Sequence, residues 1–466
     1  MNGRRIPARV LIGVAALVAA CSSLTPEYQR PAAPVAPIFP GEAGGVGKPA
    51  PEIEWQAFFI DERAKRLIAI ALQHNRDLRV AALAIEQARA QLQARRADAW
   101  PTVYAGASGL RQPNAGGNMT SLYSAGLSVT AWELDFFGRV RSLSDAALSL
   151  FYASEEARKA TQISLIAAVA GTHLALQADD ELLEATRRTL ATREDSFKLT
   201  KLKFDNGAAS ELDLRQAESL LEAANVALAQ QQRQRALDEN ALVLLLGQPL
   251  PGDLPPALPL AEQRLFSDLP AGLPSELLDR RPDLRQAERQ LIAANANIGA
   301  ARAAFYPRIT LTGSVGTAST ELSGLFKAGS LAWTFAPQLL LPIFDAGRNQ
   351  ANLQIAQAGR DIALALYERA IQTAFREVAD ALAGRATLGE QLRAQQAQAQ
   401  AEDVRSRLAD LRYRNGAASY LDVLDAQRSL FAARQAVVQV QLQQAQNLVT
   451  LYKVLGGGWT DPSAQR

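Results

Sequence analysis

One stretch of eleven residues occurs twice in this chain, and this duplication limits the possible folds more than any other feature. Residues 204–214 read FDNGAASELDL and residues 413–423 read YRNGAASYLDV, with seven identities at an offset of 209 residues. The same offset relates Leu246-Gly247 to Leu455-Gly456. A constant offset over these stretches indicates a tandem repeat, so the 466 residues form two similar halves.

Each copy of the stretch is typical of a tip between two antiparallel helices. Glycine, and less readily asparagine, accepts the left-handed conformation that ends a helix, and the pairs Asn206-Gly207 and Asn415-Gly416 supply both. A serine followed three residues later by an aspartate predicts a capped start of the next helix. These pairs are Ser210 with Asp213 and Ser419 with Asp422. We therefore expect one helical hairpin tip in each half.

The amino terminus has the pattern of an export signal. A basic start is followed by eleven apolar residues at 10–20, too few to span a bilayer, and then by Cys21, the only cysteine. The sequence VAAC resembles a bacterial lipobox, in which residues 1–20 are removed and Cys21 is lipidated. An ordinary secretory signal that leaves a single thiol is the alternative. Ser22 resembles the residue at this position in lipoproteins sorted to the outer membrane.

Composition divides the rest of the chain into two repeats and two linkers. Residues 21–54 are rich in proline and glycine, which predicts an extended lipid-anchored tether, and 248–275 is a Pro-rich connector. The first repeat is expected at 55–247, as a helix, a β-hairpin at 102–131, a long helix at 138–206 and a helix at 210–246. The second is expected at 276–458, as a helix, a β-hairpin at 308–341, a long helix at 347–415 and a helix at 419–455. A tail at 459–466 follows.

The predicted β-hairpins show the alternation of half-buried strands. In 123–131, five apolar residues from Tyr123 to Ala131 alternate with Ser, Gly, Ser and Thr, and similar alternation occurs at 309–315 and 331–336. Strands of about ten residues match the length of tilted membrane-spanning β-strands. A soluble hairpin with one buried face has the same pattern, so the strands taken singly leave both interpretations open.

The helices and strands together favour an assembly of several chains. Residues 138–206 and 347–415 contain no proline, and the first carries apolar residues at seven-residue intervals, a coiled-coil seam. The seam consists of Val169, Leu176, Leu183, Leu190, Phe197 and Phe204. Four strands cannot close a barrel, whereas two copies would give eight strands and three copies twelve, enough to leave a pore. The chain must therefore oligomerise or keep its strands out of the membrane.

Motifs throughout the chain have a combined resemblance to one family. Besides Cys21 they are LTPEYQRP at 24–31, WQAFF at 55–59, NRDL at 75–78, RRPDL at 280–284, FYPR at 305–308, PIFDAGR at 342–348 and YRNGAASYLDVLDAQ at 413–427. They resemble the TolC-like outer membrane factor family, in its lipoprotein branch, similar to OprM, over essentially the whole mature chain. The resemblance implies a fold that is mainly α with a transmembrane β-barrel portion. Long coiled-coil helices would form a trimeric α-barrel tunnel, continuous with a twelve-stranded outer-membrane barrel that takes four strands from each chain.

The resemblance also implies a function and partners. The homotrimer would be the exit duct of a tripartite efflux system, lipid-anchored in the bacterial outer membrane, with its tunnel in the periplasm. Drugs or other small molecules would reach it from an inner-membrane transporter of the resistance-nodulation-division type and a periplasmic adaptor (membrane fusion) protein. The adaptor would dock at the hairpin tips, which comprise Asn206, Gly207, Ser210, Asn415, Gly416 and Ser419.

In the family, aspartates of the repeated motif constrict the periplasmic entrance, and Asp422 and Asp425 match both positions. Asp422 has a counterpart in Asp213, so helix capping explains it, whereas the counterpart of Asp425 is Gln216. Only Asp425 therefore needs a second explanation, either a gate and selectivity ring, which we expect, or a solvated surface charge. The resemblance places Asp422 in the same gate. Bare Asp425 carboxylates around a threefold axis would repel one another, so that cations or water would lie between them.

Tyr413 matches a tyrosine that the family uses to hold the entrance closed. The arginine found in some members is replaced here by Ala418, which puts a Tyr–Arg latch in doubt. We expect the closed state to depend on packing near Tyr413 and Leu424.

The sequence predicts no catalytic, cofactor or metal site. It has no Gly-rich phosphate loop after a strand, no metal-spaced cluster and no nucleophile elbow, so we expect no enzyme. His74 and His173, the only histidines, lie in helical stretches and are expected at the surface or in packing. A net charge of +2 gives no reason to expect nucleic-acid binding. The alternative to an export duct is an exported, lipid-anchored coiled-coil scaffold or adaptor without a pore, with its strands in a soluble sheet.

Overall fold

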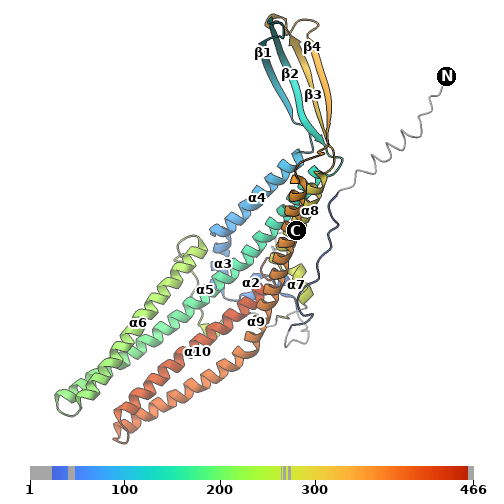
Figure 1. Cartoon of the computed structure of the whole chain (residues 1–466). Helices are drawn as coiled ribbons and strands as arrows, with labels where there is room; N and C mark the ends of the chain where they lie inside the picture. The colour runs from blue at the N-terminus through green and yellow to red at the C-terminus, as the bar shows by residue number, and fades with distance from the viewer. Residues whose placement is uncertain (1–23, 40–47, 264, 266–268, 271–273, 460–466) are drawn as a thin grey trace. The chain divides into compact units, whose positions relative to one another are not determined.

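The computed structural model describes residues 24–39, 48–263, 265, 269–270 and 274–459, and the chain divides into two compact units (Figure 1). The described residues of Met1–Ala33, Leu83–Glu156 and Arg285–Ala370 form the first, which we call the strand unit. Those of Pro34–Ala82, Ala157–Leu284 and Ile371–Arg466 form the second, the hairpin unit. The predicted signal at 1–20, Cys21 and almost all of the 459–466 tail lie outside the described residues.

The strand unit contains a four-stranded antiparallel sheet in the order β1-β2-β3-β4 (Figure 1). The strands are β1 (Val103–Pro113), β2 (Met119–Leu134), β3 (Arg308–Ser319) and β4 (Leu331–Leu340). Because β1 and β2 belong to the first repeat and β3 and β4 to the second, the pairing of β2 with β3 joins the repeats. At the centre of this pairing Gly126 faces Gly316, and a Cβ on either residue would collide with the backbone of the opposite strand.

The alternation in β2 ends earlier than the sequence predicts. The register with β3 shifts between Val129 and Trp132, and Ala131 has a φ of 51°. A β-bulge adds one residue to one strand and reverses the direction of the side chains that follow. The prediction that Ala131 continues the apolar series is therefore wrong. Beyond the bulge Trp132 pairs with Leu311, and Glu133 pairs with Thr310.

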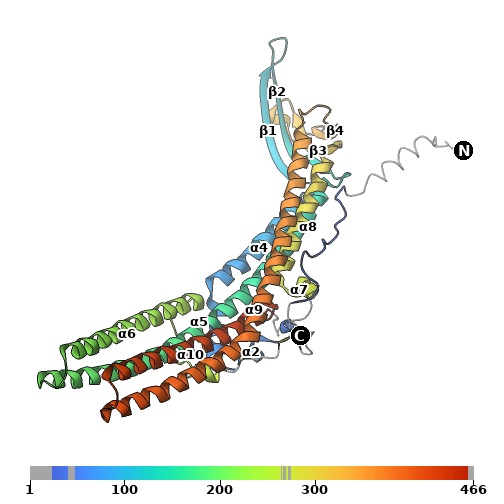
Figure 2. The same cartoon turned by 60° about the horizontal axis from the view of Figure 1, so that its bottom comes forward.

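Four long helices form the two predicted hairpins, which Figure 2 shows extending to two separate tips of the hairpin unit. The first hairpin consists of α5 (Arg139–Asp205) and α6 (Glu211–Leu246), and the second of α9 (Arg348–Arg414) and α10 (Tyr420–Val454). Both bounds of α9 lie 209 residues after those of α5, so the offset of the sequence repeat is also the offset of the structure. Both α5 and α9 begin in the strand unit and continue into the hairpin unit.

The helical region expected from residue 55 onward is divided into three. Its helices are α2 (Trp55–Phe58), α3 (Glu62–His74) and α4 (Arg76–Ala97). At the break between α3 and α4, the Asn75 Oδ1 accepts a 2.9 Å hydrogen bond from the Leu78 amide, which caps α4. The Asn75 Nδ2 donates to the Leu245 carbonyl, also at 2.9 Å, and so joins the break to the end of α6.

The second repeat has the same junction, made with different side chains. Here α7 (Pro274–Arg280) is followed by α8 (Pro282–Ala303), whose bounds lie 206 residues after those of α4. Arg281 takes the place of Asn75 and donates a 3.2 Å hydrogen bond to the Val454 carbonyl in the last turn of α10. It is also paired with Asp283 and Glu377, at 2.6 and 2.9 Å. The NRDL motif therefore fixes the start of α4 against the end of α6, and the RRPDL motif fixes the start of α8 against the end of α10.

The proline-rich segment at the described amino terminus packs against the strand unit. Asn295 of α8 donates a 2.7 Å hydrogen bond to the Pro26 carbonyl. Tyr28 and Arg30 both bind the Glu288 carboxylate, Arg30 through two 2.7 Å hydrogen bonds. A Cβ at Gly299 would collide with Thr25. The LTPEYQRP motif is thus a docked strap in this region rather than a loose tether.

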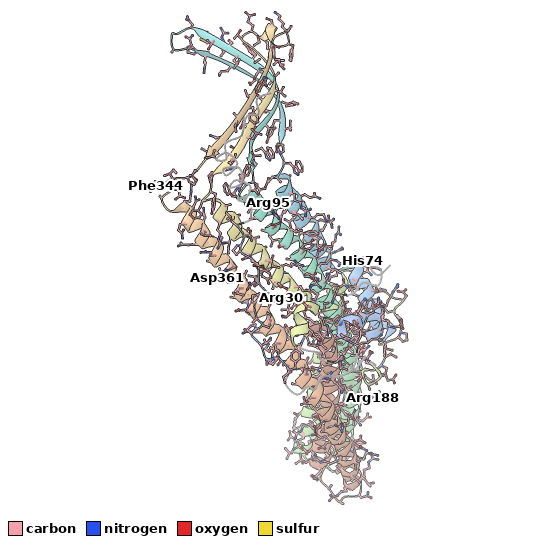
Figure 3. All side chains as sticks on the ribbon, turned by 90° about the vertical axis from the view of Figure 1, so that its right-hand side faces the viewer. Arg30, His74, Arg95, Arg188, Phe344 and Asp361 are labelled. Carbon is pink, nitrogen blue, oxygen red and sulfur yellow. The ribbon has the colours of Figure 1, made fainter. Side chains whose placement is uncertain are left out.

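The core of the hairpin unit holds aromatic and polar side chains around the short helices. Phe58 stacks on Tyr452 with ring centroids 4.0 Å apart, and the Tyr452 hydroxyl donates to the Ile53 carbonyl at 2.6 Å. His173 is buried, with its Nε2 2.8 Å from Asp61 Oδ2, whereas His74, labelled in Figure 3, is exposed. The predicted heptad seam is fully buried at Val169 but 36% exposed at Phe204, near the tip. Three short 3-10 turns, at Ala50–Glu52, Leu260–Glu262 and Leu322–Gly324, complete the described elements.

Candidate functional site

The sheet has one strongly apolar face that is exposed in the single chain. The register places Leu127 opposite Val315 and Val315 opposite Trp333, so that their side chains share a face. Trp333 is 71% exposed and Phe335, two residues further along β4, is 65% exposed. Exposed apolar patches of this kind mark a binding surface for another protein or for lipid.

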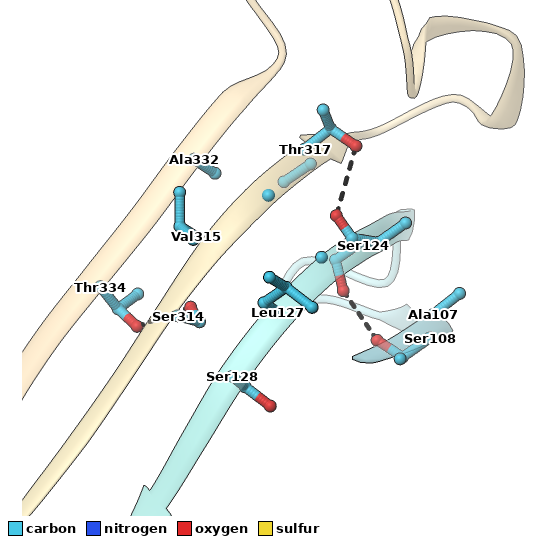
Figure 4. Close-up of a pocket in the computed structure, with 15 residues that line it drawn as sticks. Ala107, Ser108, Ser124, Leu127, Ser128, Ser314, Val315, Thr317, Ala332 and Thr334 are labelled. Carbon is cyan, nitrogen blue, oxygen red and sulfur yellow. Dashed lines mark hydrogen bonds between the residues drawn. The ribbon is translucent and has the colours of Figure 1, made fainter. Parts of the chain in front are cut away.

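In the middle of the sheet the opposite set of alternating residues is small and hydroxylated, whereas larger side chains such as Leu110 and Leu122 lie on that face nearer the β1–β2 turn. The Ser108 and Ser124 hydroxyls are 2.8 Å apart across β1 and β2, as are those of Ser314 and Thr334 across β3 and β4 (Figure 4). A cavity of about 370 Å³ lies against the middle of the sheet, lined almost entirely by glycine, alanine, serine and threonine. The predicted alternation of apolar and small polar residues is confirmed in β2, up to the bulge, and in β3 and β4.

Both edges of the sheet expose backbone hydrogen-bonding groups. In the described part of the chain, β1 pairs only with β2, and β4 pairs only with β3. An exposed strand edge is a template for pairing with another strand.

The two hairpin tips have the caps that the sequence predicts. Gly207 and Gly416 adopt φ values of 73° and 70°, which ends α5 and α9. In each tip the serine hydroxyl accepts a hydrogen bond from the third backbone N–H of the next helix. The aspartate carboxylate in turn accepts a hydrogen bond from the backbone N–H of the serine. Asp213 and Asp422 are therefore both used in capping boxes, Asp213 with Ser210 and Asp422 with Ser419.

Asp425 is not bare, contrary to the prediction. Its Oδ2 lies 2.5 Å from Nη2 of Arg405 on α9, and its Oδ1 lies 2.7 Å from Nη2 of Arg428 on α10. The hydrogen bonds from Arg405 and then Arg428 hold the pKa of Asp425 below its usual range. The premise of a bare carboxylate is therefore wrong, because two arginines of the same chain pair with it. The ring of three Asp425 copies with cations or water between them stays a prediction.

The arginine partners could have been found by comparing the repeats. The residues 209 positions before Arg405 and Arg428 are Ser196 and Ser219, just as the counterpart of Asp425 is Gln216. All three members of the cluster are thus specific to the second hairpin. The sequence reasoning considered only the carboxylate and missed the arginines.

Tyr413 binds the first hairpin through a residue that the sequence did not single out. The Lys203 ammonium of α5 donates a 2.9 Å hydrogen bond to the Tyr413 hydroxyl and lies 5.0 Å from the centroid of its ring. The Tyr420 ring lies 5.2 Å from the Tyr413 ring, and Leu424 is buried nearby on α10. Lys203 therefore joins the two hairpins of one chain through Tyr413.

The sequence profile of one family matches the chain over residues 67–248 and again over 273–457. Its description is "Outer membrane efflux protein". The chain belongs to the outer membrane efflux protein family. Within this family, the antibiotic efflux pump outer membrane protein ArpC of Pseudomonas putida is 46% identical over 466 residues, which cover 97% of this chain and 96% of ArpC. The toluene efflux pump outer membrane protein TtgC of Pseudomonas putida has the same identity and coverage.

A solved structure agrees with this assignment. The open state of the outer membrane channel MtrE of Neisseria gonorrhoeae superposes with a TM-score of 0.87 at 43% identity, covering 94% of this chain and 99% of MtrE. The predicted family and the fold of long helices with four antiparallel strands are confirmed, as is the function of an outer-membrane channel in an efflux pump. The family also confirms that the chain is not an enzyme and that it acts in the outer membrane.

None of the described helices combines the length and apolar character needed to cross a membrane. No group of three or more His, Cys, Asp or Glu side chains in the described ranges is arranged to hold a metal ion.

Proposed function

We propose that three copies of this outer membrane efflux protein assemble into one exit duct. Its four strands per chain would close a twelve-stranded barrel in the outer membrane, and its hairpins would form the periplasmic tunnel. The observation that carries the proposal is the sheet, which combines an exposed apolar face, a small hydroxylated face and two unpaired edges.

Each feature of the sheet has a physical counterpart in a closed barrel. Unpaired backbone groups in hydrocarbon cost several kcal/mol each, so β1 and β4 need partners, which neighbouring copies supply. The face of Leu127 and Trp333 would contact lipid. The face of Ser124 and Ser314 would line the pore, where small polar side chains leave room for water and cargo. Twelve strands rather than eight leave such an interior open.

The cargo and partners follow from the relatives. Because ArpC and TtgC are named for pumps of antibiotics and toluene, we infer that this channel releases antibiotics or organic solvents. The channel would receive them from an inner-membrane transporter of the resistance-nodulation-division type and a periplasmic adaptor. The tips formed by Asn206, Gly207 and Ser210, and by Asn415, Gly416 and Ser419, are the surfaces at which the adaptor would dock.

The gate of the proposed duct combines two contacts near the tips. The Lys203–Tyr413 hydrogen bond holds the second hairpin to the first. The cluster of Asp425 with Arg405 and Arg428 holds α10 to α9. Opening of the tunnel would require at least the first of these contacts to break, while Asp422 would remain in its cap.

The experiment is to purify the mature protein in detergent and to determine its mass by light scattering. We expect three chains of about 50 kDa each and stepwise conductance in planar bilayers. Deletion of the gene should sensitise the cells to antibiotics or toluene, and the intact gene should restore resistance. A stable monomer in detergent-free buffer that gives no conductance would favour the lipid-anchored scaffold instead.

A further inference from the structure

A cavity of about 340 Å³ lies between α5 and the second hairpin, within the hairpin unit. Its charged lining residues are all arginines: Arg188 and Arg193 of α5 and Arg434 of α10. Ser406 of α9 adds a hydroxyl group to the lining. Figure 3 labels Arg188 and so shows where on the hairpin unit the cavity lies. The volume is several times the ~30 Å³ that one water takes in the liquid, so a hydrated ion fits.

Arg193 carries the argument because it is a buried charge without an anion. Only 5% of the residue is exposed, and burial lowers the pKa of its guanidinium. Its Nη1 donates a 2.7 Å hydrogen bond to Oε1 of Gln427, a neutral side chain. Among the described residues no carboxylate pairs with Arg193. A buried charge is stable only when it is paired and its hydrogen-bonding groups are satisfied.

The other two arginines leave the cavity with an excess of positive charge. Arg188 is paired with Glu184 at 2.9 Å, and Arg434 with Asp403 at 2.7 Å. These two carboxylates compensate the positive charges of Arg188 and Arg434, whereas the positive charge of Arg193 is left uncompensated. The cavity therefore attracts an anion, and guanidinium N–H groups match the geometry of oxyanions.

The repeat shows that this basic cavity is not a by-product of the duplication. The counterparts of Arg188 and Arg193 in the second repeat are Ala397 and Glu402, and the counterpart of Arg434 in the first repeat is Asn225. None of these three counterparts is basic.

We propose that this cavity binds a small oxyanion of the phosphate or sulfate class, with Arg193 as its central ligand. Arg188, Arg434 and the Ser406 hydroxyl supply further donors at the rim. Because the bound ion contacts both α5 and α10, it links the first hairpin to the second. Its binding stabilises this packing and does not depend on what the channel transports.

The test is a calorimetric titration of sodium phosphate into the full mature protein in detergent, with sodium chloride adjusted to keep the ionic strength constant. We expect saturable binding, and we expect Arg193→Gln to weaken it by about tenfold or more, as for the loss of a charge-assisted hydrogen bond. The matched control is Arg235→Gln, which removes an arginine of α6 that pairs with Asp180 and Glu239 outside the cavity. The affinity of this control should equal that of the wild type.

Phosphate should also raise the thermal midpoint of the wild type but not that of Arg193→Gln. Heat that does not saturate up to about 10 mM phosphate would overturn the proposal, since affinity weaker than the millimolar range implies no built site. Equal phosphate affinities of Arg193→Gln and the wild type would also overturn it. The same holds if Arg235→Gln loses as much phosphate affinity as Arg193→Gln does. If Arg193→Gln does not fold, Arg434→Gln decides: weakened binding supports the proposal, and unchanged binding contradicts it.

Discussion

Single side chains near the hairpin tips have sharply different environments, although the sequence presents them in similar motifs. Asp425 lies between two arginines, whereas Asp213 caps a helix. We expect Asp425→Asn to leave excess positive charge on Arg428 and Arg405 and so to reduce the cation preference of the channel in planar-bilayer recordings. Asp213→Asn should leave the preference unchanged. Equal shifts in the two variants would show that the ion pairs of Asp425 have no part in selectivity.

Two neighbouring tyrosines provide a matched pair. The Tyr413 hydroxyl accepts from Lys203, whereas the buried Tyr420 hydroxyl has no hydrogen-bond partner among the described residues. Tyr413→Phe should therefore weaken the contact between the hairpins by about 1 kcal/mol and increase the frequency of channel openings. Tyr420→Phe should change neither. Single-channel recording of both variants tests this, and indistinguishable variants would remove Lys203–Tyr413 from the gate.

Asp179 makes stability depend on pH. Burial, and then the neighbouring Asp238, raises its pKa to about 7. Between about pH 4 and pH 7 the folded chain keeps a proton that the unfolded chain has lost, so stability decreases as pH rises through this window. Asp179→Asn stays neutral and should be more stable than the wild type at pH 8, by at most about 4 kcal/mol, with no such gain near pH 4. Thermal unfolding at both pH values measures the difference, and Asp253→Asn, at an exposed site in the connector, should not reproduce it.

At the scale of elements, the junctions between helices depend on close backbone approach. Gly247 ends α6 with a φ of 70°, and a Cβ there would collide with the His74 carbonyl. Gly207 has nearly the same φ, 73°, but open space around it. Gly207→Ala should lower the free energy of unfolding by about 1 kcal/mol through backbone strain alone. Gly247→Ala should lower it clearly more, because the α3–α4 junction must also move. Chemical unfolding compares them, and equal costs would mean that the junction adapts without strain.

The elements that the sequence predicts well are those specified by nearby residues. The capping boxes at Ser210 and Ser419 and the alternating strands need only a few neighbours in the chain, and the structure contains them. The break at Asn75 was missed because its partner, the Leu245 carbonyl, is 170 residues away. The bulge at Ala131 and the Arg405 partner of Asp425 were missed for a similar reason, since each depends on a facing strand or helix. Arg428, three residues from Asp425 on α10, is a local partner that comparison of the repeats could have revealed.

At the scale of the whole molecule, anchoring should come mainly from the barrel. The predicted lipid on Cys21 would add to the anchoring, but a closed barrel with an apolar outer face would hold the protein in the membrane by itself. We expect Cys21→Ala, exported with an ordinary cleavable signal, to remain in the outer membrane and to retain at least part of its efflux activity. Membrane fractionation and drug susceptibility measure this. Complete loss from the membrane would mean that the lipid is the only anchor and would favour the scaffold.

The pairing of β2 with β3 has a consequence for symmetry. A chain with a single repeat would contribute one β-hairpin, so twelve strands would require six identical subunits. Fusing two repeats into one chain, in which β2 pairs with β3, moves every second boundary between repeats inside a chain, and the proposed assembly becomes threefold. Residues such as Arg193 and Asp425 then occur three times instead of six, so that alternate hairpins around the ring are able to acquire different chemistry.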